Sequence, residues 1–183
     1  MPLHVMGYVQ MLQGLLKKLG VRTVLDLGCG DWQFSRLIDW SGIDYVGIDV
    51  VPSVIEKNQA EHSKSNVRFL LHSGDFSNLP KAELLIVKDV MQHWSNQSIF
   101  SFLPVMRTFP LSLVTNCVNP ERETVNRDIP DGEYRYLDIR LPPFSISAQE
   151  VYEFKNYKPF PLRLFAKPRW CKKVLLVQSQ ATS

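Results

Sequence analysis

The chain has 183 residues, of which 45% are hydrophobic, and its formal net charge is +3 at pH 7. This length and composition fit one globular domain with a sizeable core, so we expect residues 1–183 to form a single domain. The three cysteines lie far apart, and neither they nor the four histidines show metal-ligand spacing, which argues against a bound metal and a disulfide framework. The chain has no run of roughly 18 apolar residues and no signal-peptide pattern, so we expect a cytoplasmic protein that does not bind membranes.

Apolar residues and turn signals divide the first two thirds of the chain into alternating helices and strands. Apolar side chains recur at helical spacing over residues 3–19 and Gly20 follows as a stop, which predicts an N-terminal helix within residues 1–20. Strands are predicted at residues 21–27, 45–49, 67–71, 83–87 and 111–118. Further helices are predicted to begin at Asp31 as a cap, at Pro52 and Ser53, and at Ser95 as a cap. This alternation indicates a parallel sheet covered on both faces.

The first strand ends in the sequence LDLGCGDW, a turn with two glycines. The glycines allow backbone N–H groups to approach a ligand closely. Asp26 stands two residues before Gly28, and a carboxylate there suits a ligand's ammonium group better than a pyrophosphate. Gln33 stands in place of the third glycine of the dinucleotide pattern G-x-G-x-x-G, which weighs against a dinucleotide. Asp49 follows the second strand, about 20 residues past the glycines, where a ribose diol is bound in such folds.

Four motifs, LDLGCG, YVGIDV, SGDFSNLP and LLIVKDVMQHW, occur in the order and spacing of the class I S-adenosylmethionine-dependent methyltransferases. The chain resembles that family over residues 21–118. The resemblance implies an α/β, Rossmann-like fold with three layers, α/β/α, around a mostly parallel seven-stranded sheet. It also implies S-adenosyl-L-methionine as the cofactor. In the family, the glycine turn holds the methionine and ribose, the acid after the second strand holds the ribose hydroxyls, and the acid after the third strand contacts the adenine.

The resemblance also assigns cofactor-binding residues in this sequence. They are Asp26, Gly28, Cys29, Gly30, Trp32, Asp49, Val50, Asp75, Phe76 and Lys88. Cys29 fits as a small residue packed in the turn rather than as a nucleophile, because no histidine lies near it in the sequence. Trp32 and Phe76 are interpreted as walls of the cofactor site, with ordinary core packing as the alternative.

The family resemblance implies that the segment after the fourth strand, Lys88 to His93, faces the transferred methyl group. Transfer to a hydroxyl or amine requires an aligned acceptor and a group that accepts a proton. His93 is the first candidate for this base, because an ordinary histidine titrates near neutral pH, and its alternative role is to bond a backbone carbonyl. Asp89 is the second candidate, with Lys88 as a neighbour that lowers its pKa or holds an acidic substrate. The alternative role of Asp89 is to cap a turn.

Residues 119–149 are polar and rich in proline, and they follow the fifth strand, so they are expected at the carboxyl end of the sheet. We interpret them as a mobile substrate-side cover with few backbone partners in the sheet. Candidate acceptor contacts, which solvated side chains would equally explain, are Asn126, Asp128, Tyr134, Arg135 and Arg140. Beyond this segment, three stretches compete to form a terminal antiparallel strand pair, namely residues 151–154, 162–165 and 174–177.

The expected reaction is methyl transfer to an O or N atom of a small molecule such as a sugar or other metabolite. The motif after the fourth strand differs from the Asn/Asp-Pro-Pro-Phe/Tyr pattern of many nucleic-acid and protein N-methyltransferases. An RNA or protein side chain is the alternative acceptor, because residues 150–183 carry seven Lys or Arg against two Glu, interleaved with aromatics. A non-catalytic S-adenosylmethionine-binding accessory subunit and a dinucleotide oxidoreductase are further alternatives. The sequence leaves the oligomeric state open.

Overall fold

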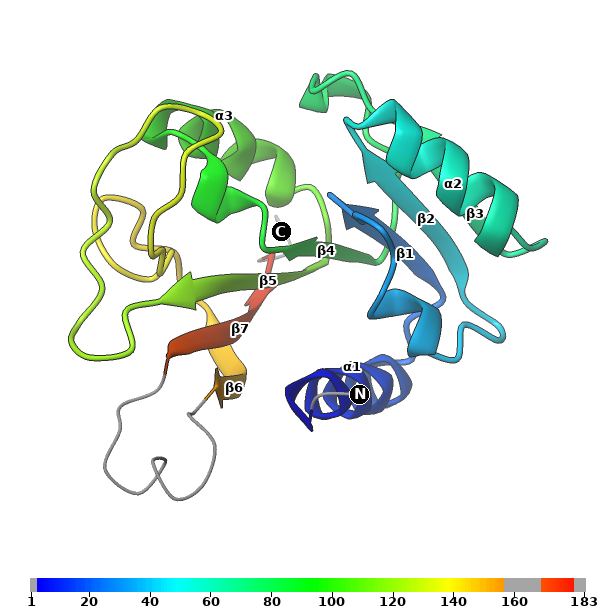
Figure 1. The fold of residues 1–183 in the computed structure, drawn as a ribbon, viewed down its shortest axis with the longest axis horizontal. Coiled ribbons are helices and arrows are strands. Elements are labelled where there is room, and N and C mark those ends of the chain that lie inside the picture. The colour runs from blue at the N-terminus through cyan, green and yellow to red at the C-terminus, as the bar shows by residue number, and fades with distance from the viewer. Residues whose placement is uncertain (1–2, 157–168, 180–183) are drawn as a thin grey trace.

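A computed structural model describes residues 3–156 and 169–179 of the chain, and its described strands form one seven-stranded sheet (Figure 1). The strands are β1 (Thr23–Leu27), β2 (Asp44–Asp49), β3 (Val67–Leu71), β4 (Leu84–Lys88), β5 (Leu111–Val118), β6 (Gln149–Asn156) and β7 (Trp170–Gln178). Their order is β3-β2-β1-β4-β5-β7-β6, in which the first five are parallel and β7 runs antiparallel to both of its neighbours. The predicted fold class, a mostly parallel Rossmann-like sheet between helices, is confirmed.

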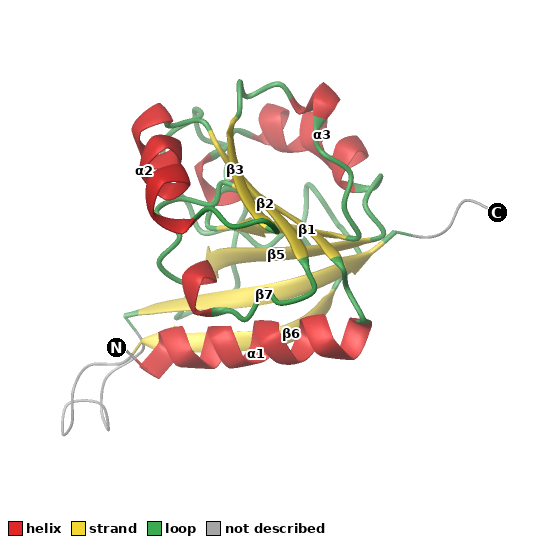
Figure 2. Ribbon diagram, turned by 90° about the vertical axis from the view of Figure 1, so that its right-hand side faces the viewer, coloured by secondary structure: helices red, strands yellow, loops and turns green. Residues whose placement is uncertain are grey.

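Helices cover both faces of the sheet, because each presents one apolar stripe to it. On one face, α1 (Leu3–Leu19) buries Tyr8, Leu12 and Leu16 at intervals of four residues in a core shared with α2 (Pro52–His62). Figure 2 shows α1 lying along the sheet beside β6 and β7. On the other face, α3 (Asn96–Met106) buries four apolar side chains in a second core. No helix in the described ranges is long and apolar enough to cross a membrane.

Two predicted helix starts are confirmed and one is wrong. Pro52 opens α2, and the hydroxyl of Ser95 caps α3 by accepting the N–H of Ser98 at 3.1 Å. The helix expected to be capped by Asp31 is absent, and only a short 3₁₀ turn, η1 (Ser35–Leu37), forms there. The Asp31 carboxylate instead accepts the Gln33 N–H, and Trp32 adopts a left-handed φ of 57°, which is incompatible with a helix start.

The segment from 119 to 149 contains no helix and joins β5 to β6, yet it forms part of the second core. Its buried apolar side chains are Leu137, Ile139, Phe144 and Ile146. The N–H of Leu137 donates to the carbonyl of Cys117 at the end of β5, at 2.8 Å. These apolar residues replace a helix as the cover of this face, and the mobility expected of the segment stays a prediction.

The terminal antiparallel pair is formed by β6 and β7, which contain two of the three competing stretches, residues 151–154 and 174–177. The third, residues 162–165, lies outside the described residues. Insertion of β7 between β5 and β6 places the basic residues Lys172 and Lys173 in the interior of the sheet. One of them therefore reaches the carboxyl end of β4, as described below.

Candidate functional site

A cavity of about 660 Å³ opens at the carboxyl ends of β1, β2 and β4. It lies beside β1, where the strand order changes direction: the chain continues to β2 and β3 on one side of β1 and to β4 and β5 on the other. This switch point is the usual place for a ligand in open α/β sheets. The volume of the cavity is within the range of small-molecule pockets, roughly 300–1,000 Å³. Every cofactor-binding or catalytic residue predicted from the sequence lines this cavity except Asp75. The topology thus brings together residues that are spread over almost 70 positions of the chain.

The glycine turn after β1 is held against β2 through its own backbone N–H groups. The N–H groups of Gly28 and Cys29 both donate to the carbonyl of Ile48, at 2.8 and 3.0 Å. The N–H of Gly30 donates to Oδ2 of Asp49 at 3.0 Å. These three donors are already bonded within the protein, and the role of the turn in cofactor binding stays a prediction. The turn suits a cationic ligand better than a phosphate, which needs free donors.

Two contacts that sequence reasoning missed fix the shape of this turn. The side-chain amide of Asn58, fully buried in α2, donates to the carbonyl of Gly30 at 2.7 Å. Val90, just after β4, packs so closely that its Cγ2 lies 2.3 Å from where a Cβ on Gly28 would stand. The sequence signal for such an anchor is an Asn on the buried face of a helix, because a buried amide needs a hydrogen-bond partner.

Asp26, at the end of β1, is buried and accepts hydrogen bonds from Tyr45 Oη at 2.7 Å and Ser35 Oγ at 3.2 Å. Burial raises the pKa of its carboxyl, although both hydrogen bonds and the charge of Lys88 act in the opposite direction. A positive charge placed beside Asp26 would favour its ionised form. Its position is therefore compatible with the expected ammonium partner.

Asp49, at the end of β2, uses its carboxylate to shape the rim of the cavity. Besides holding Gly30, it accepts the N–H of Val51 through Oδ1 at 3.0 Å. A carboxylate has about four lone-pair positions, so it retains acceptor capacity for hydroxyl groups.

The third predicted acid, Asp75, is placed differently. Its carboxylate accepts the N–H of Ser77 at 2.9 Å and its hydroxyl at 2.8 Å, and so caps the turn η2 (Phe76–Asn78). These hydrogen bonds lower the pKa of the Asp75 carboxyl. The residues that line the cavity here are its neighbours Gly74 and Phe76, together with His72.

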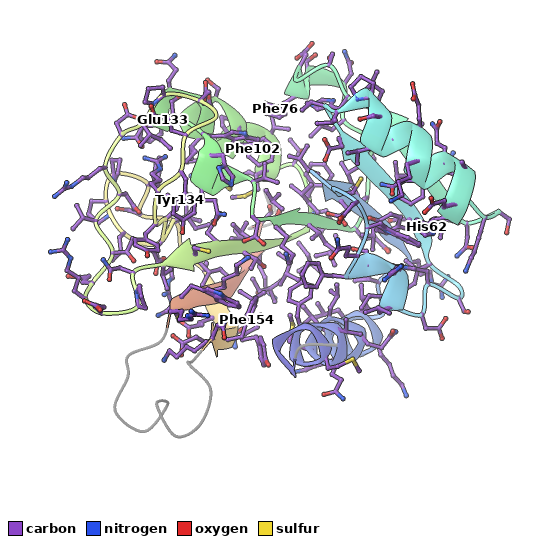
Figure 3. All side chains as sticks on the ribbon, viewed as in Figure 1. His62, Phe76, Phe102, Glu133, Tyr134 and Phe154 are labelled. Atoms are coloured by element: carbon purple, nitrogen blue, oxygen red, sulfur yellow. The ribbon has the colours of Figure 1, made fainter. Side chains whose placement is uncertain are left out.

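Phe76 connects this rim to the opposite side of the cavity. Its ring packs against Phe102 of α3, with centroids 4.9 Å apart (Figure 3). The Trp94 ring lies 5.2 Å from that of Phe76. His72 lies on the other side of Phe76, with ring centroids 5.8 Å apart, and burial lowers its pKa. Apolar ring faces at this end suit a flat aromatic group.

His93 ends the 3₁₀ turn η3 (Met91–His93) and lines the cavity. Its Nδ1 lies 2.9 Å from the carbonyl of Glu133, which can only accept, so Nδ1 carries the proton. The buried Gln92 accepts the Cys117 N–H through Oε1 at 2.8 Å, which turns its amide nitrogen toward His93 Nε2 at 3.4 Å. Nε2 therefore carries the lone pair of the ring, which faces the Gln92 amide N–H. Sequence reasoning missed Gln92.

Asp89 adopts a left-handed φ of 60° and lies between two lysines. Its Oδ2 accepts Lys88 Nζ at 2.6 Å and Lys172 Nζ at 2.5 Å. Burial works to raise the pKa of the Asp89 carboxyl, but the two lysines outweigh it and the pKa is lowered. A carboxylate held in this way is a weak base, so the geometry favours His93 as the proton acceptor.

The segment 119–149 contributes Asp131 and Gly132 to the cavity lining. Four of its five candidate contact residues instead hold the segment together. Asn126 donates to the carbonyls of Asp138, Leu141 and Pro142, and Asp128 accepts the Asn96 N–H. Arg135 donates to the Trp94 carbonyl and to the Asn96 side chain. Arg140 donates to the carboxylates of Asp138 and Glu150. Tyr134, the fifth, is half exposed and its ring lies 5.8 Å from that of His93 (Figure 3). None of the five lines the cavity.

Comparison with known families agrees with this geometry. Residues 24–108 match the family model described as a methyltransferase domain, which spans β1 to the end of α3. Residues 24–108 therefore form a methyltransferase domain, and the sheet around them has the class I S-adenosylmethionine-dependent methyltransferase fold. A search of curated proteins finds no match.

Solved structures share the fold of the methyltransferase domain at low sequence identity. The methyltransferase domain of bacterial CtHen1-C is 16% identical, with 93% of this chain and 97% of that one covered and a TM-score of 0.61. Magnesium protoporphyrin IX methyltransferase from Synechocystis, with bound S-adenosylhomocysteine, is 16% identical, with 95% and 83% covered and a TM-score of 0.60. Human N-acetylserotonin methyltransferase in complex with S-adenosylmethionine is 15% identical, with 97% and 56% covered and a TM-score of 0.58.

Proposed function

We propose that the chain transfers a methyl group from S-adenosylmethionine to an O or N atom of a small molecule such as a sugar or other metabolite. The bonded state of the glycine turn is the observation that carries the proposal. The N–H groups of Gly28, Cys29 and Gly30 are already bonded, so these three residues offer no free donor to a pyrophosphate. A cofactor with a sulfonium and an ammonium group suits this surface, with Asp26 beside it.

The roles of the remaining cofactor residues follow from their positions around the cavity. Asp49 would accept hydrogen bonds from the ribose hydroxyls at the end of β2. Val50 and Phe76 would enclose the adenine, and Asp75 would contact its exposed edge. Cys29 and Trp32 would support the turn, and Lys88 would face the methionine end. When bound, S-adenosylmethionine supplies an electrophilic methyl group that a nucleophilic O or N atom can attack directly.

His93 would accept the proton that the acceptor loses. Its proton on Nδ1 is directed to the Glu133 carbonyl, so Nε2 carries the lone pair, which would exchange the Gln92 N–H for the proton of the acceptor. The carbonyl also fixes the ring orientation, which reduces the cost of aligning base and acceptor. Asp89 is tied to two lysines and would stay ionised without taking part in the proton transfer.

The charges on β6 and β7 favour a small acceptor over RNA or a protein side chain. Lysines of these strands form ion pairs within the sheet. The pairs are Lys155 with Glu153 at 2.6 Å and Lys173 with Glu150 at 3.0 Å. Paired cations attract phosphates less than free ones do. Two of the structural neighbours are also named for small-molecule substrates, a porphyrin and N-acetylserotonin.

Calorimetry with S-adenosylhomocysteine and NAD tests the cofactor class. We expect saturable binding of the first and none of the second, and the reverse would favour an oxidoreductase. Incubation with methyl-labelled S-adenosylmethionine and fractionated small metabolites, RNA or protein then tests the acceptor class. Label in the small-molecule fraction, lost in a His93→Ala variant that still binds S-adenosylhomocysteine, supports the proposal. Cofactor binding without transfer to any fraction would favour an accessory subunit.

A further inference from the structure

Two lysines from separate strands meet at one carboxylate beside the cavity. Lys88 ends β4 and Lys172 lies in β7, with β5 between these strands. Both ammonium groups contact the same atom, Oδ2 of Asp89, at 2.6 and 2.5 Å. Their side chains are only 16% and 19% exposed. Bringing two buried cations to one carboxylate oxygen is costly, so the arrangement calls for an explanation.

The ammonium groups have more donors than the described protein satisfies. Each has three N–H bonds, and its hydrogen-bond acceptor among the described residues is Asp89 Oδ2 alone. The ammonium groups also lie over ring faces, of Phe34 at 4.1 Å and Tyr8 at 5.7 Å from Lys88, and of Trp170 at 5.6 Å from Lys172. Ring faces attract a cation but do not replace a hydrogen-bond acceptor. The cluster therefore keeps a net charge of +1 and unused donors.

Asp89 itself is placed to hold the two lysines together. Its second oxygen, Oδ1, is buried and has no hydrogen-bond partner among the described residues. A ligand would therefore meet the ammonium groups and not this oxygen. The left-handed backbone at Asp89 costs of order 1 kcal/mol or more, and such strain is common at functional sites.

We propose that Lys88 and Lys172 form a binding site for a carboxylate at the β4 side of the cavity. A single carboxylate has two oxygens that can bridge two ammonium groups, as Asp89 does through one, and its charge matches the net charge of the cluster. Resting on the proposed function, the carboxylate has two sources: the methionine moiety of the cofactor, or an acidic group on the acceptor. Lys88 lines the cavity, and Lys172 would reach the same anion from β7.

Calorimetry on Lys172→Met tests the first source. The probes are S-adenosylhomocysteine, which carries the carboxylate, and 5′-methylthioadenosine, which lacks the whole amino-acid end. We expect a loss of at least tenfold in affinity for the first and no change for the second. The matched control is Lys173→Met, because the neighbouring Lys173 pairs with Glu150 at 3.0 Å. This control should bind both probes as the wild type does.

Acetate tests the second source. Amide NMR spectra of the protein, with and without S-adenosylhomocysteine, are recorded during an acetate titration. If the acceptor supplies the carboxylate, acetate should give saturable shifts at Val90 and Cys171 in the loaded wild type, and Lys172→Met should abolish them. If Lys172→Met does not fold, Lys88→Met and Lys172→Gln serve in its place.

The proposal is overturned if the folded lysine variants bind both nucleosides as the wild type does and acetate gives no saturable shift. Failure of the proposed function is a separate result. In that case the wild type would not bind S-adenosylhomocysteine at all, while saturable, Lys172-dependent acetate shifts would still establish the carboxylate site.

Discussion

The Val90 side chain occupies the space beside Gly28, with Cγ2 2.3 Å from the position of a Cβ on that glycine. Gly28 also has a left-handed φ of 74°. The turn after β1 and the residue after β4 are therefore fitted to one another, and the cavity between these strands depends on that fit. A side chain at position 28 has both a conformational and a steric cost.

The first prediction separates these two costs. We expect Gly28→Ala to destabilise the protein and to reduce S-adenosylhomocysteine affinity at least tenfold. Gly42→Ala is the matched control, because Gly42 has the same φ of 74° but no atom within 4 Å of its Cβ position. The midpoint temperature of thermal unfolding should be lower for Gly28→Ala than for Gly42→Ala. Adding Val90→Ala to Gly28→Ala should partly restore that midpoint. Equal stability of the two glycine variants would mean that the Val90 contact is unimportant.

The second prediction concerns Asp49. Removing its carboxylate deletes acceptors for the ribose and for Gly30, and hydrogen bonds to a charged group contribute roughly 1.5–3 kcal/mol each. We therefore expect Asp49→Ala to lower S-adenosylhomocysteine affinity at least tenfold by calorimetry. Asp44→Ala, at the opposite and exposed end of β2, should bind normally. Unchanged affinity of a folded Asp49→Ala variant would contradict the proposed role.

The third prediction tests the anchor that Asn58 provides. Asn58 and Gln59 are adjacent in α2, and each donates its side-chain amide to a backbone carbonyl, of Gly30 at 2.7 Å and of Phe69 at 2.8 Å. Alanine at either position should lower stability by about 1 kcal/mol or more. Only Asn58→Ala should also weaken S-adenosylhomocysteine binding, because only its partner belongs to the glycine turn. Equal binding by both variants would limit Asn58 to a structural role.

The sequence predicts the parallel strands and most helices well, because their apolar periodicity matches their burial. Its main errors concern segments without periodicity. Trp32 was expected in the first turn of a helix, but its ring packs on Phe69 with centroids 5.2 Å apart, and this tertiary contact fixes a non-helical backbone. Leu137 and Ile139 belong to a short alternation of apolar and charged residues, and the prolines and charges around it obscure this sign of burial.

Most predicted site residues line the cavity because their motifs follow strand ends, and parallel strands bring those ends to one edge. Long-range partners were beyond the reach of such reasoning. Lys172 contacts Asp89 only because β7 inserts antiparallel beside β5. Asn58 reaches Gly30 only because α2 packs over the turn. Tyr8, from α1, lines the cavity although nothing local in its sequence indicates it.

The fourth prediction concerns Asp131, which ties the segment 119–149 to the start of α3. Its carboxylate accepts the Ser95 N–H at 2.6 Å and the Ser98 hydroxyl at 2.8 Å, and these bonds lower its pKa. Because the pKa of Asp131 is lower in the folded protein, these hydrogen bonds stabilise the fold fully when the pH is above the ordinary pKa of 3.8. This stabilisation is lost as the pH falls through the lower pKa of the folded state.

We therefore expect Asp131→Asn to lower the midpoint of thermal unfolding by about 2–4 °C at pH 7, as a loss of about 1 kcal/mol gives in a protein of this size. The difference from the wild type should shrink as the pH is lowered toward 3. Combining it with Ser98→Ala should cost less than the sum of the two changes, because they remove one shared bond. A difference that stays constant from pH 7 to 3 would show that the carboxylate charge is not involved.

The fifth prediction concerns the proton on His93, which is fixed from two sides. Glu133 offers a carbonyl to Nδ1, and Gln92 directs an amide N–H toward Nε2 because its oxygen is occupied by the Cys117 N–H. When the imidazole is neutral, its ¹⁵N NMR signals should therefore show the proton on Nδ1. With an identified acceptor, His93→Ala should lower turnover at least a hundredfold and leave S-adenosylhomocysteine affinity unchanged, as expected for a base that acts in the transition state. Gln92→Ala should weaken the preference for Nδ1, since Nε2 would then lose its donor. A wild-type ring protonated on Nε2 would have no lone pair to offer the acceptor, and the role of base would pass from His93 to another group.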